Sequence, residues 1–416
     1  MSVVGFLLFA VLMVAALAGI NAVVFRWARN AFRLSSRGQR LLKTLLWMAI
    51  AGTILGRVAG RFWPGAVTTS VIAVSSTLEL AAIISGVLLM VADAVRLLSS
   101  LPGRLRRAAP LLAKDSPAAP ASPAANQPEL PRRALLTQAV AGSAFLIGSS
   151  SSLYGVLKGR LDYSIEEASF KLPGLSRGFD GFTIVQLSDV HIGAFTGAAE
   201  LAAAEALVRK AKPDLIVLTG DLLDNDGRLA DQLGRFVRRL SPLAREGVVA
   251  ITGNHDFFAG VTEMAGAVRA AGGRILRNSG VVVGGAEAGI ALLGVDDVWA
   301  RRQGAGPDLQ RAVAALPQLG GKLAPALDLP RVLLCHNPSF FKEAAGQVAL
   351  QLSGHTHGGQ VNLGIRPADY LLPGGWVAGR YDLRGSALYV NRGFGTVGPP
   401  ARLGAAPEVT RVVLTA

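Results

Sequence analysis

The chain is short of the residues that crosslink a fold. One cysteine, Cys335, stands among 416 residues, so an intrachain disulfide is excluded. A domain the length of residues 159–416 can bury an adequate core without crosslinks, and their absence therefore excludes no compartment. Cys335 follows a short apolar run, and we interpret it as a small buried residue at the end of a strand.

Acidic residues are scarce in the first part of the chain. Residues 1–158 hold 4 Asp+Glu against 16 Lys+Arg, whereas residues 159–416 hold 24 against 26. The net charge of +14 therefore comes almost entirely from the first part. Its positive residues flank long apolar stretches, which is typical of membrane orientation, and we expect no nucleic-acid partner.

Four apolar segments of this basic region are long enough to cross the ~30 Å hydrocarbon core of a bilayer as helices. They are residues 2–25, 44–62, 71–92 and 134–157. A buried soluble helix could explain any one of them, but four together, with so few acidic residues, predict a membrane region at 1–158. Residues 108–128 are rich in Pro and Ala and are interpreted as a linker.

The basic residues of the loops predict an orientation. Residues 26–43 carry six Lys+Arg and residues 93–133 carry seven, whereas Arg57 and Arg61 alone lie around the connection between the second and third segments. We therefore expect the first and third loops in the cytoplasm. The predicted location is the inner (cell) membrane, as a multi-pass protein in contact with the lipid bilayer, with residues 159–416 outside the cytoplasm.

Histidine is rare too, and all five histidines lie in short polar motifs that follow apolar runs predicted to be strands. The runs are 182–187, 214–218, 248–251, 332–334 and 348–352, and the motifs after them are Asp189-Val190-His191, Gly220-Asp221, Gly253-Asn254-His255-Asp256, His336 and Gly354-His355-Thr356-His357. Helical stretches at 198–212 and 262–271 separate some of the strands and indicate an α/β fold. Open α/β sheets bind ligands at the carboxyl ends of their strands, so these loops are expected to converge.

The residue types of these motifs are typical of a metal site. Imidazole, carboxylate and amide groups are the donors that transition metals prefer. The glycines before Asp221, Asn254 and His355 predict turns in which the backbone takes a positive φ or approaches another group closely.

In order and spacing, the motifs resemble the full set of the calcineurin-like metallophosphoesterase superfamily, over roughly residues 180–416. The longer forms 354–360 and 391–395 are similar to a bacterial branch of exported or membrane-anchored phosphoesterases. The resemblance implies a four-layered α/β/β/α sandwich at 159–416, preceded here by an all-α transmembrane region.

The resemblance also implies two divalent metal ions, with Mn, Zn and Fe all open as their identity. Carried over position by position, one ion would be held by Asp189, His191, Asp221 and His357, and the other by Asp221, Asn254, His336 and His355. Asp221 would bridge two ions about 3.5–4 Å apart, which could hold a hydroxide between them. His255 would contact the substrate and protonate the leaving oxygen, a role typically worth roughly 10²–10⁴-fold in rate.

We therefore expect a membrane-anchored phosphoesterase that hydrolyses a phosphodiester or pyrophosphate by metal-bound hydroxide. Lipid- and envelope-linked esters are among the candidate substrates. A phosphomonoesterase of the same fold and a non-catalytic metal-binding scaffold or sensor remain alternatives. A transporter would need paired charges in the membrane region, where Glu79 and Arg57 are the candidates, and a structural role is favoured for Glu79. The sequence makes no prediction of oligomeric state.

Several polar residues near the motifs have two interpretations. Asp256 could orient His255 or cap a helix near Val261. Arg392 could bind a substrate phosphate or form a structural salt bridge. Three carboxylates that also follow strands are expected to be solvated and are left outside the site: Asp224, Asp296 and Asp297.

Overall fold

A computed structural model describes residues 3–108, 132–285, 288–316 and 328–416 and divides the chain into two compact units. The helical unit comprises residues 1–59 and 66–153, and the α/β unit comprises residues 60–65 and 154–416. The predicted linker, 108–128, lies almost entirely outside the described residues.

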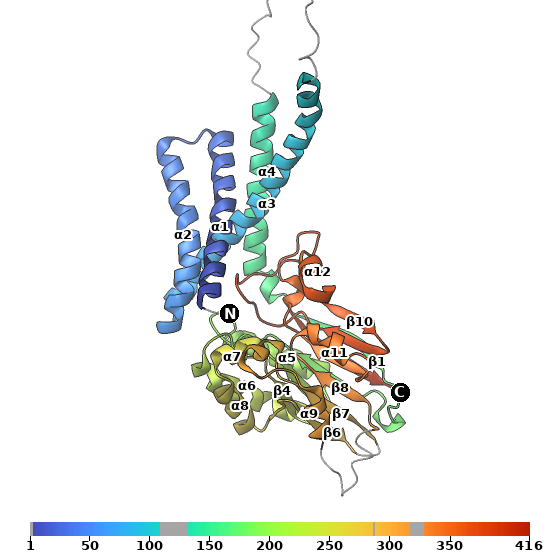
Figure 1. Cartoon of the computed structure of the whole chain (residues 1–416). Coiled ribbons are helices and arrows are strands. Elements are labelled where there is room, and N and C mark those ends of the chain that lie inside the picture. The colour runs from blue at the N-terminus through green and yellow to red at the C-terminus, as the bar shows by residue number, and fades with distance from the viewer. Residues whose placement is uncertain (1–2, 109–131, 286–287, 317–327) are drawn as a thin grey trace, which may run out of the picture. The chain divides into compact units, whose positions relative to one another are not determined.

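Four long helices make up most of the helical unit: α1 (Val3–Phe32), α2 (Ser36–Phe62), α3 (Ala66–Ala108) and α4 (Arg132–Leu157) (Figure 1). Each predicted membrane segment falls within one of them, except for Ser2 of the first segment, which lies outside the described residues. All four are long and apolar enough to cross a membrane. Many of their large apolar side chains are exposed, as at Leu12 and Leu55, which is unfavourable in water and typical of a surface that faces lipid.

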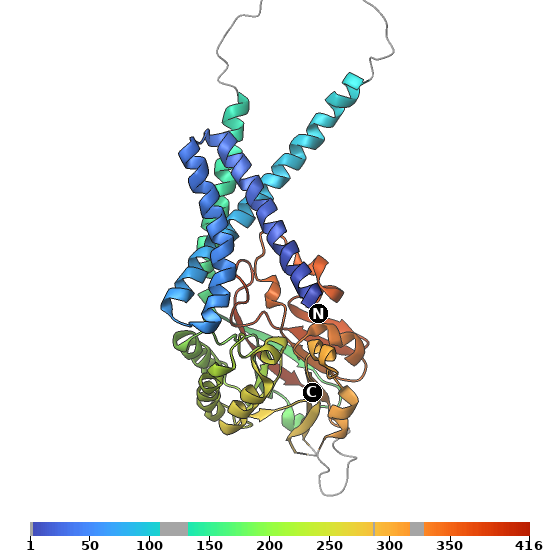
Figure 2. The same cartoon turned by 60° about the vertical axis from the view of Figure 1, so that its left-hand side comes forward.

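Small and polar side chains join these helices where α3 crosses α1 (Figure 2). Gly86 of α3 has no side chain to keep Ile20 of α1 at a distance, and Ser85 Oγ donates to the carbonyl of Ala144 in α4 at 3.1 Å. Asn21 Nδ2 donates to Glu79 Oε2 at 3.3 Å. Close approach and interhelical hydrogen bonds hold helices together where lipid removes the hydrophobic driving force. Glu79 is thus bonded within the helical unit, as its structural interpretation requires.

In the described part of the α/β unit, two six-stranded sheets form the centre. The first sheet has the strand order β1 (Ser164–Lys171), β12 (Glu408–Thr415), β2 (Thr183–Leu187), β3 (Leu215–Thr219), β4 (Val248–Ile251) and β5 (Arg274–Ile275). The second has the order β10 (Gly379–Leu383), β11 (Ser386–Val390), β9 (Leu350–Ser353), β8 (Arg331–Leu334), β7 (Gly289–Gly294) and β6 (Ser279–Gly284). Strands β2 to β5 run parallel, and so do β7, β8, β9 and β11.

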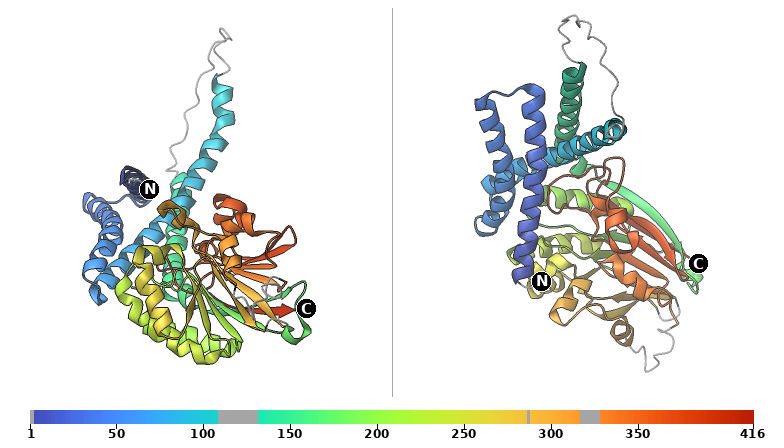
Figure 3. Two further views of the ribbon diagram at one scale, coloured as in Figure 1. Left: turned by 60° about the horizontal axis from the view of Figure 1, so that its bottom comes forward. Right: turned by 45° about the horizontal axis from the view of Figure 1, so that its top comes forward.

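Alternating side chains of these strands build the layers. In β2, Val185 and Leu187 belong to a core shared with α5 (Ala198–Ala211), α6 (Ala230–Leu240) and α8 (Val261–Ala270), whereas Ile184 belongs to the core between the two sheets. The outer face of the second sheet packs against α9 (Leu309–Ala314) and the segment that leads into α11 (Phe341–Ala344). The predicted four-layered α/β/β/α sandwich is therefore confirmed (Figure 3).

The strands that precede the motifs are also confirmed, to within two residues at either end, as β2, β3, β4, β8 and β9. The C-terminal strand β12 was not predicted. It enters the first sheet between β1 and β2, parallel to the former and antiparallel to the latter. The carboxyl ends of β2, β3 and β4 in one sheet and of β8 and β9 in the other carry the polar motifs.

Candidate metal centre

The polar motifs leave their strands in an unusual backbone conformation. Ten non-glycine residues among those described have a positive φ, and five of them are predicted metal ligands: Asp189, His191, Asp221, His355 and His357. Such conformations cost energy and persist where the surrounding structure holds them, most often at functional sites.

The glycines before the ligands behave as the sequence predicts. Gly220 has a φ of +88°, and an added Cβ would lie 2.7 Å from the amide nitrogen of Gly253 and 2.8 Å from His336 Nδ1. A Cβ on Gly354 would collide with the side chains of Ser188 and Asp189. Both glycines therefore let two ligand loops approach each other.

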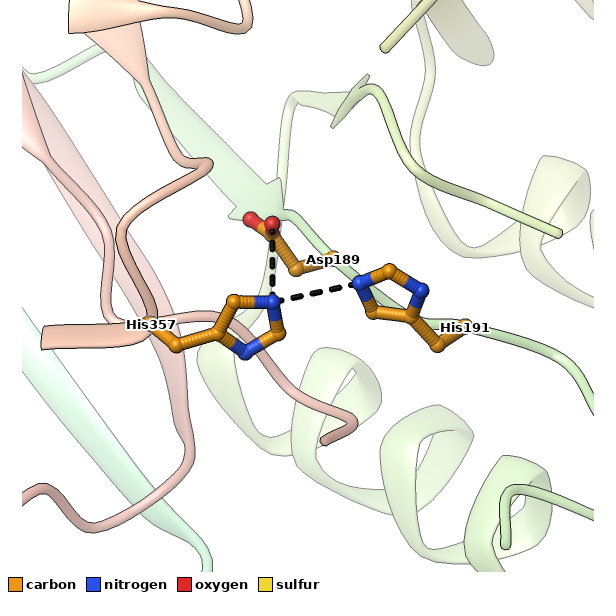
Figure 4. A group of neighbouring side chains, drawn as sticks. All are labelled: Asp189, His191 and His357. Atoms are coloured by element: carbon orange, nitrogen blue, oxygen red, sulfur yellow. Dashed lines mark hydrogen bonds and ion pairs between the residues drawn. The ribbon is translucent and has the colours of Figure 1, made fainter. Parts of the chain in front are cut away.

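Asp189, His191 and His357 form the first cluster (Figure 4). Asp189 and His191 follow β2, whereas His357 follows β9 in the other sheet. His357 Nε2 lies 3.3 Å from Asp189 Oδ1 and 3.1 Å from His191 Nε2. All three side chains are almost fully buried.

Asp221, His336 and His355 form the second cluster, and Asn254 lies beside it. His336 Nε2 is 3.2 Å from Asp221 Oδ2 and 3.2 Å from His355 Nδ1. His355 Nδ1 is also 3.0 Å from Asn254 Oδ1. Asn254 is the first residue of α7 (Asn254–Ala259).

The Asp221 carboxylate faces both clusters. The Oδ2 atom that approaches His336 lies 3.7 Å from His191 Nε2, while Oδ1 accepts a hydrogen bond from the amide of His255 at 2.7 Å. Burial alone would raise the pKa of Asp221, but the neighbouring His336 and His191 hold it below its ordinary value. The structure thus brings all seven predicted ligands together, with Asp221 in the middle.

The donor atoms of these clusters fit bound cations. The Thr219 carbonyl lies 2.8 Å from His336 Nδ1 and fixes the proton of the neutral ring there, which leaves a lone pair on Nε2. That lone pair faces a carboxylate and another imidazole, while His191 Nδ1 has no hydrogen-bond partner among the described residues. Buried electronegative atoms so close together need a proton or a cation between them. The mixed nitrogen and oxygen donors suit two divalent transition metals.

His255 lies beside the first cluster rather than inside it. Its Nδ1 donates to the carbonyl oxygen of Asp224 at 2.7 Å, its ring packs edge-on against His191, and its side chain is 16% exposed. Burial lowers the pKa of His255, but Asp224 and Asp221 outweigh burial and raise it to about 9. Because Nδ1 is held, Nε2 is the ring atom left for a ligand.

Asp224 is closer to the site than the sequence indicated. Its Oδ1 lies 3.4 Å from His255 Nδ1 and 3.7 Å from His191 Nδ1. Burial would raise the pKa of Asp224, but the neighbouring His191 and His255 keep it below its ordinary value. Its place three residues after Asp221, in the same loop, is the signal that could have identified it.

Solvation is the wrong expectation for the other two carboxylates that were left out, whereas the side chain of Asp224 is 40% exposed. Asp296 is 4% exposed and pairs with Arg277 at 2.8 Å, and Asp297 is fully buried with Oδ2 unbonded among the described residues. Both follow β7, whose carboxyl end lies at the same edge of its sheet as those of β8 and β9. A buried carboxylate at this edge adds negative charge around the second cluster.

Asp256 caps a helix, but the helix is α7 rather than the one near Val261, and its carboxylate binds backbone amides rather than the His255 ring. Its Oδ1 accepts from the amides of Leu222 and Leu223 at 2.9 and 3.1 Å, and its Oδ2 accepts from the amide of Gly253 at 2.9 Å. The fully buried carboxylate therefore fixes the loop after β3 against the loop after β4.

Two arginines complete the surroundings. Arg392 pairs with Glu166 and Glu408, both at 2.6 Å, which is the structural interpretation. Arg402 was not predicted as part of the site. It is 1% exposed and donates to the carbonyls of Gly395 and Arg392 among others. Its Nη2 lies 3.1 Å from His357 Nδ1. Burial, and then the charge of Arg402, lower the pKa of His357 and favour the neutral ring that can ligate a metal.

Comparison with known proteins places this region among phosphoesterases. The profile of the family described as Calcineurin-like phosphoesterase matches residues 182–359. The metallophosphoesterase YkuE of Bacillus subtilis (strain 168) is 32% identical over 284 residues, which cover 65% of this chain and 92% of that protein. All seven predicted ligands and His255 lie within the matched range.

Two further relatives are named as a transmembrane protein and as a phosphodiesterase. A transmembrane protein with metallophosphoesterase domain from Danio rerio is 31% identical over 288 residues, or 65% of this chain and 62% of that protein. The phosphodiesterase YaeI of Escherichia coli (strain K12) is 32% identical over 241 residues, or 56% of this chain and 82% of that protein.

Asp256→Asn is expected to loosen the centre without removing a ligand. The amide nitrogen of asparagine would oppose a backbone N–H, so that a buried donor loses its acceptor at a cost of about 1–3 kcal/mol. We expect a lower thermal unfolding temperature in detergent and less bound metal by elemental analysis. Asp382→Asn is the matched control, because Asp382 is exposed on β10. Equal stability and metal content in the two variants would contradict this role of Asp256.

Proposed function

Because the chain belongs to the calcineurin-like phosphoesterase family, whose members use two divalent metal ions, we propose that this metal-dependent phosphoester hydrolase cleaves a phosphodiester or pyrophosphate at a membrane. The observation that carries the proposal is the Asp221 carboxylate, buried between two clusters of histidines. The preference for a diester is supported by the relative named as a phosphodiesterase.

In this proposal the ligands divide between two ions that share one carboxylate. Asp189, His191, Asp221 and His357 would hold one ion, and Asp221, Asn254, His336 and His355 the other. Two divalent ions supply Lewis-acid chemistry here, because they neutralise the phosphoryl oxygens and lower the pKa of water. The protein contributes a buried, rigid donor set, since hydrogen bonds to backbone groups, such as that between His336 and the Thr219 carbonyl, fix the predicted ligands before substrate arrives.

His255 is proposed to serve the leaving group. The Asp224 carbonyl holds Nδ1–H, and Nε2 is then free to hydrogen-bond a substrate oxygen and pass a proton to it as the ester bond breaks. The ring is partly exposed, whereas His191 and His336 are buried, so it can reach a substrate that enters from solvent.

The proposed location is the inner membrane, crossed four times, with the α/β unit outside the cytoplasm. It is supported by the four apolar helices and by the basic residues at 26–43 and 93–133. Attachment to the bilayer suits lipid- or envelope-linked phosphate esters, which are the proposed substrate class.

Asp221→Asn is expected to empty the centre, because it removes the negative charge that both ions would share. Bound metal should fall from two equivalents to fewer than one. Turnover of a chromogenic bis-aryl phosphate should fall by more than about 100-fold, which exceeds the loss expected for residues that only orient a ligand. Asp382→Asn should retain both values. Two retained equivalents at the wild-type rate would rule out a shared carboxylate.

His255→Ala should separate catalysis from metal binding. We expect two equivalents of metal to remain and turnover of the same substrate to fall at least roughly tenfold, the low side of what losing a general acid costs. A rate equal to that of the wild type would remove His255 from the reaction. If wild-type protein loaded with Mn²⁺ or Zn²⁺ cleaves no phosphate ester, a metal-binding scaffold or sensor is the better description.

Reporter fusions test the orientation. Alkaline phosphatase needs an extracytoplasmic environment, so it should be active when fused after residue 158 and inactive when fused after residue 35. A fluorescent protein that folds only in the cytoplasm should give the reverse pattern. Active phosphatase at residue 35 together with cytoplasmic fluorescence at residue 158 would invert the proposed topology.

A further inference from the structure

The segment after the His355–His357 turn exposes large apolar side chains. In residues 361–377, called the apolar loop below, Leu363 is 45% exposed, Ile365 68%, Tyr370 85% and Leu371 78%. Among the other described residues from 162 onward, only Phe258 has a large apolar side chain that is comparably open. Tyr370 and Leu371 lie on the short helix α12 (Ala368–Leu371) (Figure 1). Such a concentration of apolar surface is unfavourable in water and marks a place of contact.

Both ends of the apolar loop are fixed to the turn that carries two predicted ligands. At its start, Asn362 Nδ2 donates to the carbonyl of Gly358 at 3.0 Å. At its end, Thr356 Oγ1 donates to the carbonyl of Val377 at 2.6 Å. Within the loop, Arg366 pairs with Asp369 at 2.7 Å. The exposed side chains are therefore presented by an ordered structure next to the metal centre.

The base of the loop also lies close to the point where the chain leaves its last membrane-length helix. Within the α/β unit, the amide of Asn362 donates to the carbonyl of Leu403 at 2.8 Å, and the amide of Arg402 donates to the carbonyl of Gly155 at 3.1 Å. Gly155 is in the last turn of α4, inside the candidate span Ala134–Leu161. Two consecutive residues, Arg402 and Leu403, thus connect the loop to the end of that span.

We propose that the apolar loop docks on the lipid bilayer, with Ile365, Tyr370 and Leu371 inserted between headgroups and acyl chains. Tyrosine and leucine beside an arginine are typical of segments that lie in the membrane interface. The attachment through α4 keeps the loop beside lipid at a high effective concentration, so that a few apolar side chains suffice for docking. This contact goes beyond the proposed reaction, because it positions the metal centre at the lipid surface whatever ester is cleaved there.

Site-specific labels on the full-length protein in lipid nanodiscs test the docking. The only native cysteine, Cys335, is fully buried and gives the unlabelled background. A polarity-sensitive dye on Leu371→Cys should emit at shorter wavelength than on the matched control Asp382→Cys, whose side chain is 61% exposed on β10. Lipids with nitroxide near the headgroup should quench it at least about threefold more strongly than the control, since interfacial segments sit roughly 5–10 Å deep.

Two outcomes at position 371 overturn the proposal, and a second labelled position must agree with the first. Emission and quenching at position 371 that match position 382 overturn it. A shift in emission without quenching by nitroxide lipids also overturns it, because the loop is then covered by protein, either the chain's own helices or a second copy. The same dye on Ile365→Cys must repeat the result at position 371. Quenching does not depend on hydrolysis, so wild-type turnover of a soluble bis-aryl phosphate tests the proposed function separately.

Discussion

A single buried carboxylate, set between histidines from two sheets, is the constraint on which the α/β unit depends. Asp221 follows a strand of the first sheet, yet its Oδ2 lies 3.2 Å from Nε2 of His336, which follows a strand of the second. The carboxyl edges of the two sheets must therefore meet within hydrogen-bonding distance. Gly220 shows how little room is left, since a Cβ there would press on both Gly253 and His336. Lone pairs this close repel one another, and bound cations would turn that repulsion into attraction.

Two buried side chains of opposite charge, Asp256 and Arg402, fix the backbone around this carboxylate. Asp256 accepts three amide hydrogen bonds from the loops after β3 and β4, in the first sheet. Arg402 donates to the carbonyls of Arg392 and Gly395 before it and of Ala405 after it, and also to the carbonyl of His357, which follows a strand of the second sheet. A buried charge without partners is very costly, but here backbone dipoles neutralise each one. The Asp256 carboxylate thus fixes backbone amides, and the Arg402 guanidinium fixes backbone carbonyls. The positive-φ turns between these two side chains have little freedom to relax.

The sequence predicts those parts of the structure whose residues carry their own local pattern. Strands β2, β3, β4, β8 and β9 are recognisable because each is a short apolar run that ends in a ligand motif. Strand β12 has no such motif, and its place between β1 and β2 depends on pairing with residues more than 200 positions earlier. Arg402 and Asp256 bind backbone groups. Because such groups are the same for almost every residue type, the partners of these two side chains cannot be identified from the sequence. The burial of Asp297 depends in the same way on packing between elements distant in sequence.

Sheet topology explains why the apolar loop lies at the metal centre. Strand β11 separates β9 from β10, runs parallel to β9 and is antiparallel to β10. The chain therefore leaves β9 and enters β10 at the same edge of the sheet, where the predicted ligands lie. The connection has to pass the end of β11 without crossing the sheet, and it carries His355 and His357 at its start and the exposed apolar side chains farther on. Any surface that binds this loop is consequently close to the predicted metal centre, and a bilayer bound there would bring its own phosphate esters within reach of that centre.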